Sequence, residues 1–308
     1  MAVSRLSRSA SLGVLLVATV PLWGCNGGGD TAVAAAVPED TSEAGIWWKL
    51  RKASPSPSTS PTATSTPSPT PSVTATPTPT ASSVADFLLY WGPGATESAA
   101  QALADIVTSH GLTYRRVDAS GLNAMTSAEL ASYSTILWPG GDSNVADAAL
   151  SPDTKIRVRQ AVINSGVGFS GFCAGAWIAV GPNPGTAAPA WGFAILAGNY
   201  LKEYLPNGQY LTNAMVPITY ADGSVRSEVW WQGPYLWSNV GTVVAKYPTG
   251  EAATIESWAG KGYVTLTGVH PEAPQSWRDG LNDTDGLDTA FAWSMIDAAR
   301  RKSPLRTF

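Results

Sequence analysis

The stretch "GFSGFCAGAWIAV" (Gly168–Val180) holds Cys173, one of only two cysteines in a chain of 308 residues. A short apolar run leads up to the cysteine, and a segment that reads as the start of a helix follows it. Gly171 and Gly175 stand two residues to either side. A sharp strand-to-helix turn strains the backbone at its central residue, and flanking glycines remove Cβ atoms that would clash there. The pattern predicts a nucleophile elbow with sulfur in place of the usual serine oxygen.

Such a turn places the sulfur at a helix N-terminus, where the partial positive charge favours thiolate over thiol. The backbone N–H of Ala174 is then directed toward the position of a developing oxyanion. A glycine turn at Gly140 and Gly141, after another apolar run, is the expected second donor.

A thiol nucleophile also needs a base and a group that orients the base. The chain has two histidines. His110 ends a predicted surface helix, where it faces the helix dipole. His270 directly follows an apolar run in "GVHPE", with Glu272 two residues on. Cys173, His270 and Glu272 form a candidate triad; the alternative is that the motifs coincide by chance and the thiol is a buried, inert side chain.

The surrounding sequence alternates apolar strand patterns with helical ones joined by short loops. Strands are expected at 86–91, 113–117, 134–141, 167–173 and 262–268, and helices at 98–111, 151–166 and 288–302. Thr126 and Glu129 have capping-box spacing. This alternation predicts an α/β fold, a parallel sheet flanked by helices on both faces, with ligands at the carboxyl ends of the strands. Residues 191–263 are expected to add antiparallel strands and loops.

The N-terminus has the pattern of an export signal. Arg5 and Arg8 precede a short apolar run, and "LWGC" ends at Cys25. "LWGC" resembles a bacterial lipobox, which implies a lipoprotein signal peptide over 1–24 and lipidation of Cys25; the alternative is an ordinary signal peptide cut elsewhere. The resemblance implies an exported protein anchored to the cell-envelope membrane, and Asn26 favours the outer membrane.

Residues 25–85 are expected to be a disordered Pro/Ser/Thr-rich linker, because they contain too little apolar surface to offset the entropy of ordering. The remainder, 86–308, is long enough for one domain with a substantial core. The net charge of −4 and the lack of a basic cluster argue against nucleic acid as a partner. No metal site and no cofactor are expected; the expected partner is a small-molecule or envelope-derived substrate.

The motifs "PGG", "GFCAGAW" and "GVHPE", in this order over a parallel α/β pattern, resemble the class I glutamine amidotransferase-like fold, a flavodoxin-like fold. "YWGPG", "CAGA", "WWQGPYLW" and "HPE" are similar to the domain found at the N-terminus of some biotin–protein ligases. The resemblance implies that Cys173 is the nucleophile, His270 the base and Glu272 its orienter, with Gly141 and Ala174 as the oxyanion hole.

The chain departs from glutaminases of this fold at Trp177, which stands where they have a glutamine. Glutamine is therefore a doubtful substrate, and biotin transfer is not implied because no ligase catalytic domain follows. Two functions remain open. One is a thiol hydrolase or transferase acting on an amide or acyl bond, and the other is a non-catalytic ligand-binding module in which Trp231 and Tyr235 line the pocket. A buried core is the third interpretation of these aromatic residues.

Overall fold

The computed structural model describes residues 85–308, and these form a nine-stranded mixed sheet together with two small two-stranded sheets. Five strands of the large sheet are parallel and lie in the order β2-β1-β3-β4-β13. They are β1 (Phe87–Tyr90), β2 (Tyr114–Val117), β3 (Thr135–Trp138), β4 (Gly168–Phe172) and β13 (Gly262–Thr267). This is the flavodoxin-like strand order, and it confirms the parallel α/β architecture expected from the sequence.

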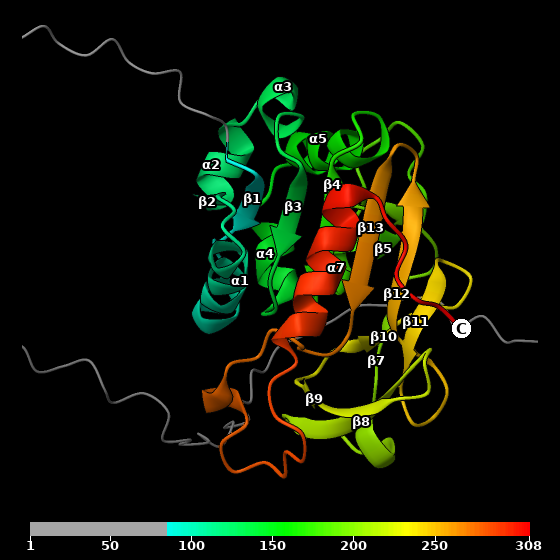
Figure 1. The fold of residues 1–308 in the computed structure, drawn as a ribbon. Helices are drawn as coiled ribbons and strands as arrows, with labels where there is room; N and C mark the ends of the chain where they lie inside the picture. The colour runs from blue at the N-terminus through cyan, green and yellow to red at the C-terminus, as the bar shows by residue number, and fades with distance from the viewer. Residues whose placement is uncertain (1–84) are drawn as a thin grey trace, which may run out of the picture. The chain divides into compact units, whose positions relative to one another are not determined.

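Helices cover both faces of the parallel strands. The helices α1 (Glu97–Ser109) and α7 (Thr289–Arg301) pack on one face together with Phe87 and Leu89 of β1. Leu88 and Tyr90, which alternate with them along the strand, point into the larger core on the other face. That core holds side chains from α2 (Ala119–Ala124), α3 (Ser127–Leu130), α4 (Ser143–Ala148), α5 (Pro152–Ile163) and α6 (Ala174–Ala179). In Figure 1, α7 lies across β4 and β13.

The remaining four strands extend the sheet beyond β13 in antiparallel fashion, in the order β12-β11-β8-β9. They are β8 (Ala214–Tyr220), β9 (Val225–Trp230), β11 (Thr242–Lys246) and β12 (Ala252–Ala259). The small sheets pair β5 (Val180–Gly181) with β6 (Leu196–Ala197) and β7 (Lys202–Glu203) with β10 (Pro234–Tyr235). Two short 3₁₀ helices are η1 (Pro206–Gly208) and η2 (Gln275–Trp277). The expectation of antiparallel strands after residue 191 is confirmed.

Local sequence signals explain where several helices begin. Thr126 and Glu129 form a complete capping box at the start of α3. Ser151 caps α5 and Pro152 occupies its first turn, where the missing N–H costs nothing. The short helix α4 was not expected from the sequence, although its cap is visible there: Asp142 accepts hydrogen bonds from the N–H groups of Asn144 and Val145.

Both glycines around Cys173 are required by close backbone packing. A Cβ at Gly175 would lie 2.5 Å from the carbonyl oxygen of Trp138, and one at Gly171 would lie 2.7 Å from the carbonyl of Gly175. The elbow therefore packs β4, α6 and β3 at a distance that admits no side chain at either position. This gives the glycine spacing of the motif its physical reason.

The predicted signal peptide, Cys25 and the predicted linker apart from residue 85 lie outside the described residues. Within residues 85–308, no helix has the length and apolar character needed to cross a membrane.

The packing of Gly175 predicts that Gly175→Ala destabilises the fold by about 2 kcal/mol or more, because an overpacked core must shift its backbone. Urea unfolding of the purified protein measures this difference. Gly111→Ala is the control: its Cβ would meet open space, and only its left-handed backbone, worth about 1–2 kcal/mol, opposes the change. A Gly175→Ala variant as stable as the wild type would contradict the packing described for the elbow.

Candidate functional site

Strand register brings three loops together at one end of the parallel strands. Phe172 at the end of β4 pairs with Thr267 of β13, and Trp138 at the end of β3 pairs with Gly171. The next residues of each strand therefore leave the sheet side by side: Cys173 after β4, His270 after β13 and the 139–141 turn after β3. In Figure 1 the arrowhead of β13 points to this end of the sheet, where β7 and β10 lie. The carboxyl ends of parallel strands are where such folds bind ligands.

Cys173 has the strained backbone that a nucleophile elbow requires. Its φ of 46° and ψ of −98° are unusual for a residue with a side chain, and it stands at the N-cap position of α6. Its backbone N–H donates to the carbonyl of Thr267 at 2.9 Å. The side chain is 4% exposed, and the thiol donates a hydrogen bond to the carbonyl of Trp231 at 3.5 Å. The thiol is thus fixed between β13 and the β9–β10 connection.

His270 is buried beside the thiol in a fixed orientation. Its Nδ1 is 2.8 Å from Oε1 of Glu272, and its backbone N–H donates to Val229 at 2.8 Å. A Cβ at Gly140 would lie 2.4 Å from Cε1 of His270, so the imidazole packs flush against the backbone of the β3 turn. His270 is 2% exposed, yet its Nε2 has no hydrogen-bond partner among residues 85–308. Of the two ring nitrogens, Nδ1 is bonded to Glu272, and Nε2 is available to another group.

The charges around His270 favour its protonated form. Burial lowers the pKa of the imidazole, but the Glu272 carboxylate and the nearby Cys173 sulfur raise it, and the net result is a pKa of about 10. Glu272 itself is 1% exposed, and its Oε2 has no partner within the described chain. This environment therefore stabilises the imidazolium form of His270 over the neutral imidazole.

Two backbone N–H groups beside the thiol carry no hydrogen bond. Neither Gly141 nor Ala174 donates its N–H to any acceptor within residues 85–308. Gly141 has a φ of 144°, and a Cβ there would lie 1.9 Å from the carbonyl oxygen of Gly94. Only glycine therefore fits the turn that presents the first of these amides, while the first residue of α6 presents the second. These are the two positions named as oxyanion donors from the sequence.

Cys173, His270 and Gly141 line a single cavity of about 1010 Å³. Trp177 and Trp231 also line it, and the side chain of Trp231 is 38% exposed. Tyr235 does not line this cavity. Its ring stands edge-on to Trp237, with centroids 4.9 Å apart, and packs against the core under β8 and β9. Of the two aromatic residues expected in a binding pocket, the structure brings Trp231 to the site and leaves Tyr235 outside it.

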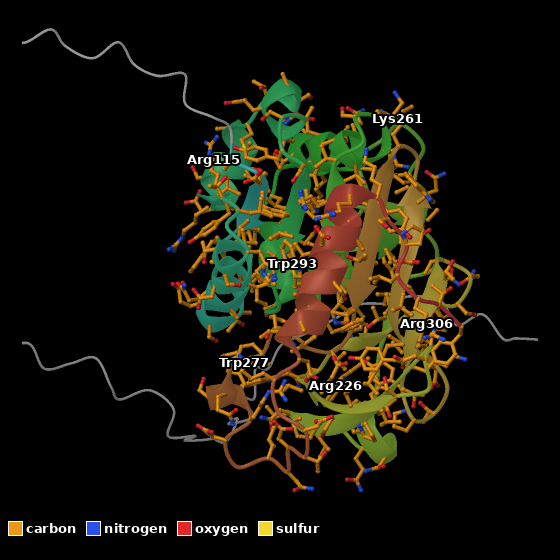
Figure 2. The ribbon with its side chains drawn as sticks, viewed as in Figure 1. Arg115, Arg226, Lys261, Trp277, Trp293 and Arg306 are labelled. Carbon is orange, nitrogen blue, oxygen red and sulfur yellow. The ribbon has the colours of Figure 1, made fainter. Side chains whose placement is uncertain are left out.

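Trp277 covers the candidate base and was not anticipated from the sequence. Its ring lies 5.1 Å from that of His270 and 5.3 Å from that of Trp231, and its Nε1 donates to Ser98 at the start of α1. Figure 2 shows it at the end of the molecule to which β13 points. The neighbouring Arg278 fixes this segment through ion pairs with Asp283 and Asp288. No motif singles out Trp277, because its position depends on a loop that folds back over the sheet.

Buried charges continue behind Glu272. The Glu228 carboxylate accepts a hydrogen bond from the hydroxyl of Tyr220. Burial first, and the nearby Asp288 carboxylate second, raise the pKa of Glu228 to about 8. Sequence reasoning missed this group, since a single glutamate in a β-strand pattern carries no signal of burial. His110, the other histidine, ends α1 as expected and stacks on Trp293, with centroids 3.8 Å apart.

The sequence matches no protein-family model and no curated protein. Solved structures that resemble it include a putative GMP synthase subunit from Thermoplasma acidophilum, 15% identical, with a TM-score of 0.43 over 71% of this chain and 96% of that one. The glutaminase domain of Trypanosoma brucei CTPS, with bound acivicin, is 13% identical, with a TM-score of 0.44 over 71% and 95%.

An exo-β-1,4-mannosidase from Opitutaceae bacterium strain TAV5 is 13% identical, with a TM-score of 0.37 over 70% of this chain and 36% of that one. At such identities and scores, similarity carries no information on substrate or reaction.

The contact between Gly140 and His270 predicts a selective effect of Gly140→Ala. The added methyl group must push the imidazole aside, so iodoacetamide labelling of Cys173 slows by about tenfold or more. Because the group that must move is the side chain of His270 and not the backbone, the free energy of unfolding stays within about 2 kcal/mol of the wild type. Labelling kinetics followed by mass spectrometry, with thermal melting as control, test this. Unchanged labelling would mean that the imidazole does not act on the thiol.

The raised pKa of Glu228 predicts a pH-dependent stability. Its folded pKa of about 8 lies above its ordinary value of 4.5, so the stability it contributes is full below pH 4.5 and is lost as pH rises toward 8. Gln at this position cannot ionise. The free energy of unfolding of Glu228→Gln, measured with urea relative to that of the wild type, therefore rises by about 2 kcal/mol or more between pH 5 and 8. A stability difference between variant and wild type that is constant over this pH range would contradict a raised pKa of the buried Glu228 carboxyl.

Proposed function

We propose that residues 86–308 act as a cysteine-nucleophile hydrolase or transferase on an amide or acyl bond. One observation carries this proposal: His270 bonds Glu272 through Nδ1 at 2.8 Å, while its Nε2, which has no partner among residues 85–308, and the Cys173 thiol belong to the same cavity. A base oriented by a carboxylate on one side and free on the other is what activation of a thiol requires.

In the acylation step, His270 holds the proton of the Cys173 thiol as an imidazolium, and the sulfur of Cys173 attacks the carbonyl carbon of the substrate. The carbonyl π electrons move to oxygen and form a tetrahedral oxyanion. The N–H groups of Gly141 and Ala174, which donate to no acceptor within residues 85–308, are available to stabilise that oxyanion. The oxyanion then collapses, the bond to the leaving group breaks, and the leaving group takes the proton from the imidazolium. A thioester on Cys173 remains.

In the second step, water or another acceptor gives a proton to His270 and attacks the thioester carbon. Collapse of this second oxyanion expels the sulfur and leaves it beside the imidazolium, which restores the starting state. Water releases a carboxylic acid, and an amine or alcohol acceptor releases the transferred acyl product. Glu272 holds one imidazole orientation throughout and compensates its positive charge, since both side chains are buried.

We further propose that the protein is exported and tethered to the envelope through a lipid on Cys25, with residues 25–85 as spacer. The basis is the N-terminal sequence pattern alone. Incorporation of a labelled fatty acid by the wild type, and its loss in Cys25→Ser, is the expected result. A Cys25→Ser protein that still takes up the label would contradict it.

A non-catalytic binding module is the second candidate function. It is favoured by the thiol's hydrogen bond to the Trp231 carbonyl rather than to His270, and by the exposed indole of Trp231 in the cavity. In that case a ligand bound in the cavity loses affinity in Trp231→Ala but not in Cys173→Ala.

The catalytic proposal predicts that activated esters, such as p-nitrophenyl esters, transfer their acyl group to Cys173. Intact-mass analysis should show a single acyl adduct in the wild type, none in Cys173→Ala, and formation slowed by about a hundredfold or more in His270→Ala. Glu272→Gln should slow it less, because the imidazole keeps a hydrogen-bond partner.

His110→Ala is the matched control, since it removes the other histidine and leaves the cavity intact. Acylation of the wild type no faster than that of His270→Ala would overturn the catalytic proposal and leave the binding module.

A further inference from the structure

The walls of the cavity at Cys173 have an unusual chemical composition. Among residues 85–308, no aliphatic side chain, lysine or arginine lines it. Its large side chains are aromatic: Trp177, Trp191, Tyr200, Trp231 and Trp277. Tyr200 and Trp231 are among the few large apolar side chains of the described chain that remain substantially exposed. Bare aromatic faces attract cations through the ring quadrupole and also cover methylene chains.

Apart from His270, which is paired with Glu272, the charged side chains of the wall are carboxylates. Asp142, Glu203 and Asp279 line the cavity, and none of them forms a salt bridge within the described residues. The carboxylate of Asp142 already accepts hydrogen bonds from backbone N–H groups, because it caps α4. Asp279 is exposed, whereas Glu203 is half-buried. Burial raises the pKa of the Glu203 carboxyl, as expected for a group with no counter-ion.

Glu203 belongs to the same wall as the thiol. It pairs with Pro234 in the β7–β10 sheet, and the following residue, Tyr204, bonds the carbonyl of Gly233. The same β9–β10 connection supplies the Trp231 carbonyl that accepts the thiol hydrogen bond. An independent feature marks the space between them as a ligand site: the buried Nε2 of His270, which lines the cavity and has no partner within the described residues.

We infer that the substrate of this site carries a positively charged amine, bound by Glu203 as its counter-ion, while the aromatic walls cover the carbon chain between the amine and the acyl group. This inference rests on the proposed function and specifies its substrate class. A substrate carboxylate would face three carboxylates, and no arginine or lysine from residues 85–308 lines the cavity beside them. Anionic acyl compounds are therefore excluded, and amine-bearing amides or esters are selected.

Thiol reagents of matched size and opposite charge test this without requiring acyl transfer. Trimethylammonioethyl and sulfonatoethyl methanethiosulfonate each form a mixed disulfide with a thiolate and release methanesulfinate. Their rates are measured on full-length Cys25→Ser protein, in which Cys173 is the only thiol. The expected ratio of cationic to anionic rates exceeds that of free mercaptoethanol by about tenfold or more at low salt, and salt diminishes it.

Glu203→Gln should reduce this ratio severalfold, and Asp279→Asn, at an exposed position that tolerates substitution, should reduce it less. Asp153→Asn, which removes an exposed carboxylate outside the cavity, should leave it unchanged. A ratio equal to that of mercaptoethanol, or one that Glu203→Gln leaves intact in a folded protein, overturns the inference. Charge selectivity without any acyl adduct from esters would overturn the catalytic proposal alone, so the two failures are distinguishable.

Discussion

The pairing of β4 with β13 is the constraint on which the whole site depends. These strands are far apart in the chain, yet their parallel register ends with Phe172 beside Thr267, and Cys173 continues it by bonding the Thr267 carbonyl. The elbow and the histidine loop must then leave the sheet together. Gly140, in the turn after the neighbouring strand β3, closes the arrangement, because the imidazole fills the space that a Cβ would occupy there. A one-residue slip of β13 would turn its side chains to the opposite face and separate the imidazole of His270 from the thiol.

Burial makes the electrostatics of this site strong. His270 and Glu272 are both almost fully shielded from water, and the Glu272 carboxylate and the Cys173 sulfur together outweigh the desolvation that lowers the pKa of the imidazole. Behind them, Arg278 and Asp288 form an ion pair near Glu228, whose own carboxyl is raised to a pKa of about 8. A network of this kind costs stability when one member is removed, because the remaining charge stays buried. It also holds Trp277 over the imidazole through Arg278, which links the rigid core to the wall of the cavity.

Much of the fold could be predicted from the sequence because its signals are local. Apolar runs ended by glycine marked β1, β3 and β13, a run reaching Cys173 marked β4, and the Thr126–Glu129 spacing marked the capping box of α3. The positions of Cys173, His270 and Glu272 followed from strand ends, since parallel strands place successive loops at one edge. What was missed depends on tertiary packing. Tyr235 stands only four residues after Trp231 but faces the core instead of the cavity. Glu203, Trp277 and Arg278 acquire roles only when distant loops fold over the sheet.

Titration of the two histidines by nuclear magnetic resonance tests the central claim most directly. His110 supplies an internal reference on the same spectrum. The account predicts that the His270 imidazole titrates far above its ordinary value of 6.5, with a pKa near 10, and that Cys173→Ala and Glu272→Gln each lower this pKa. A His270 that titrates near 6.5, or whose pKa does not respond to removal of the thiol, would show that the sulfur and the imidazole do not act as a pair.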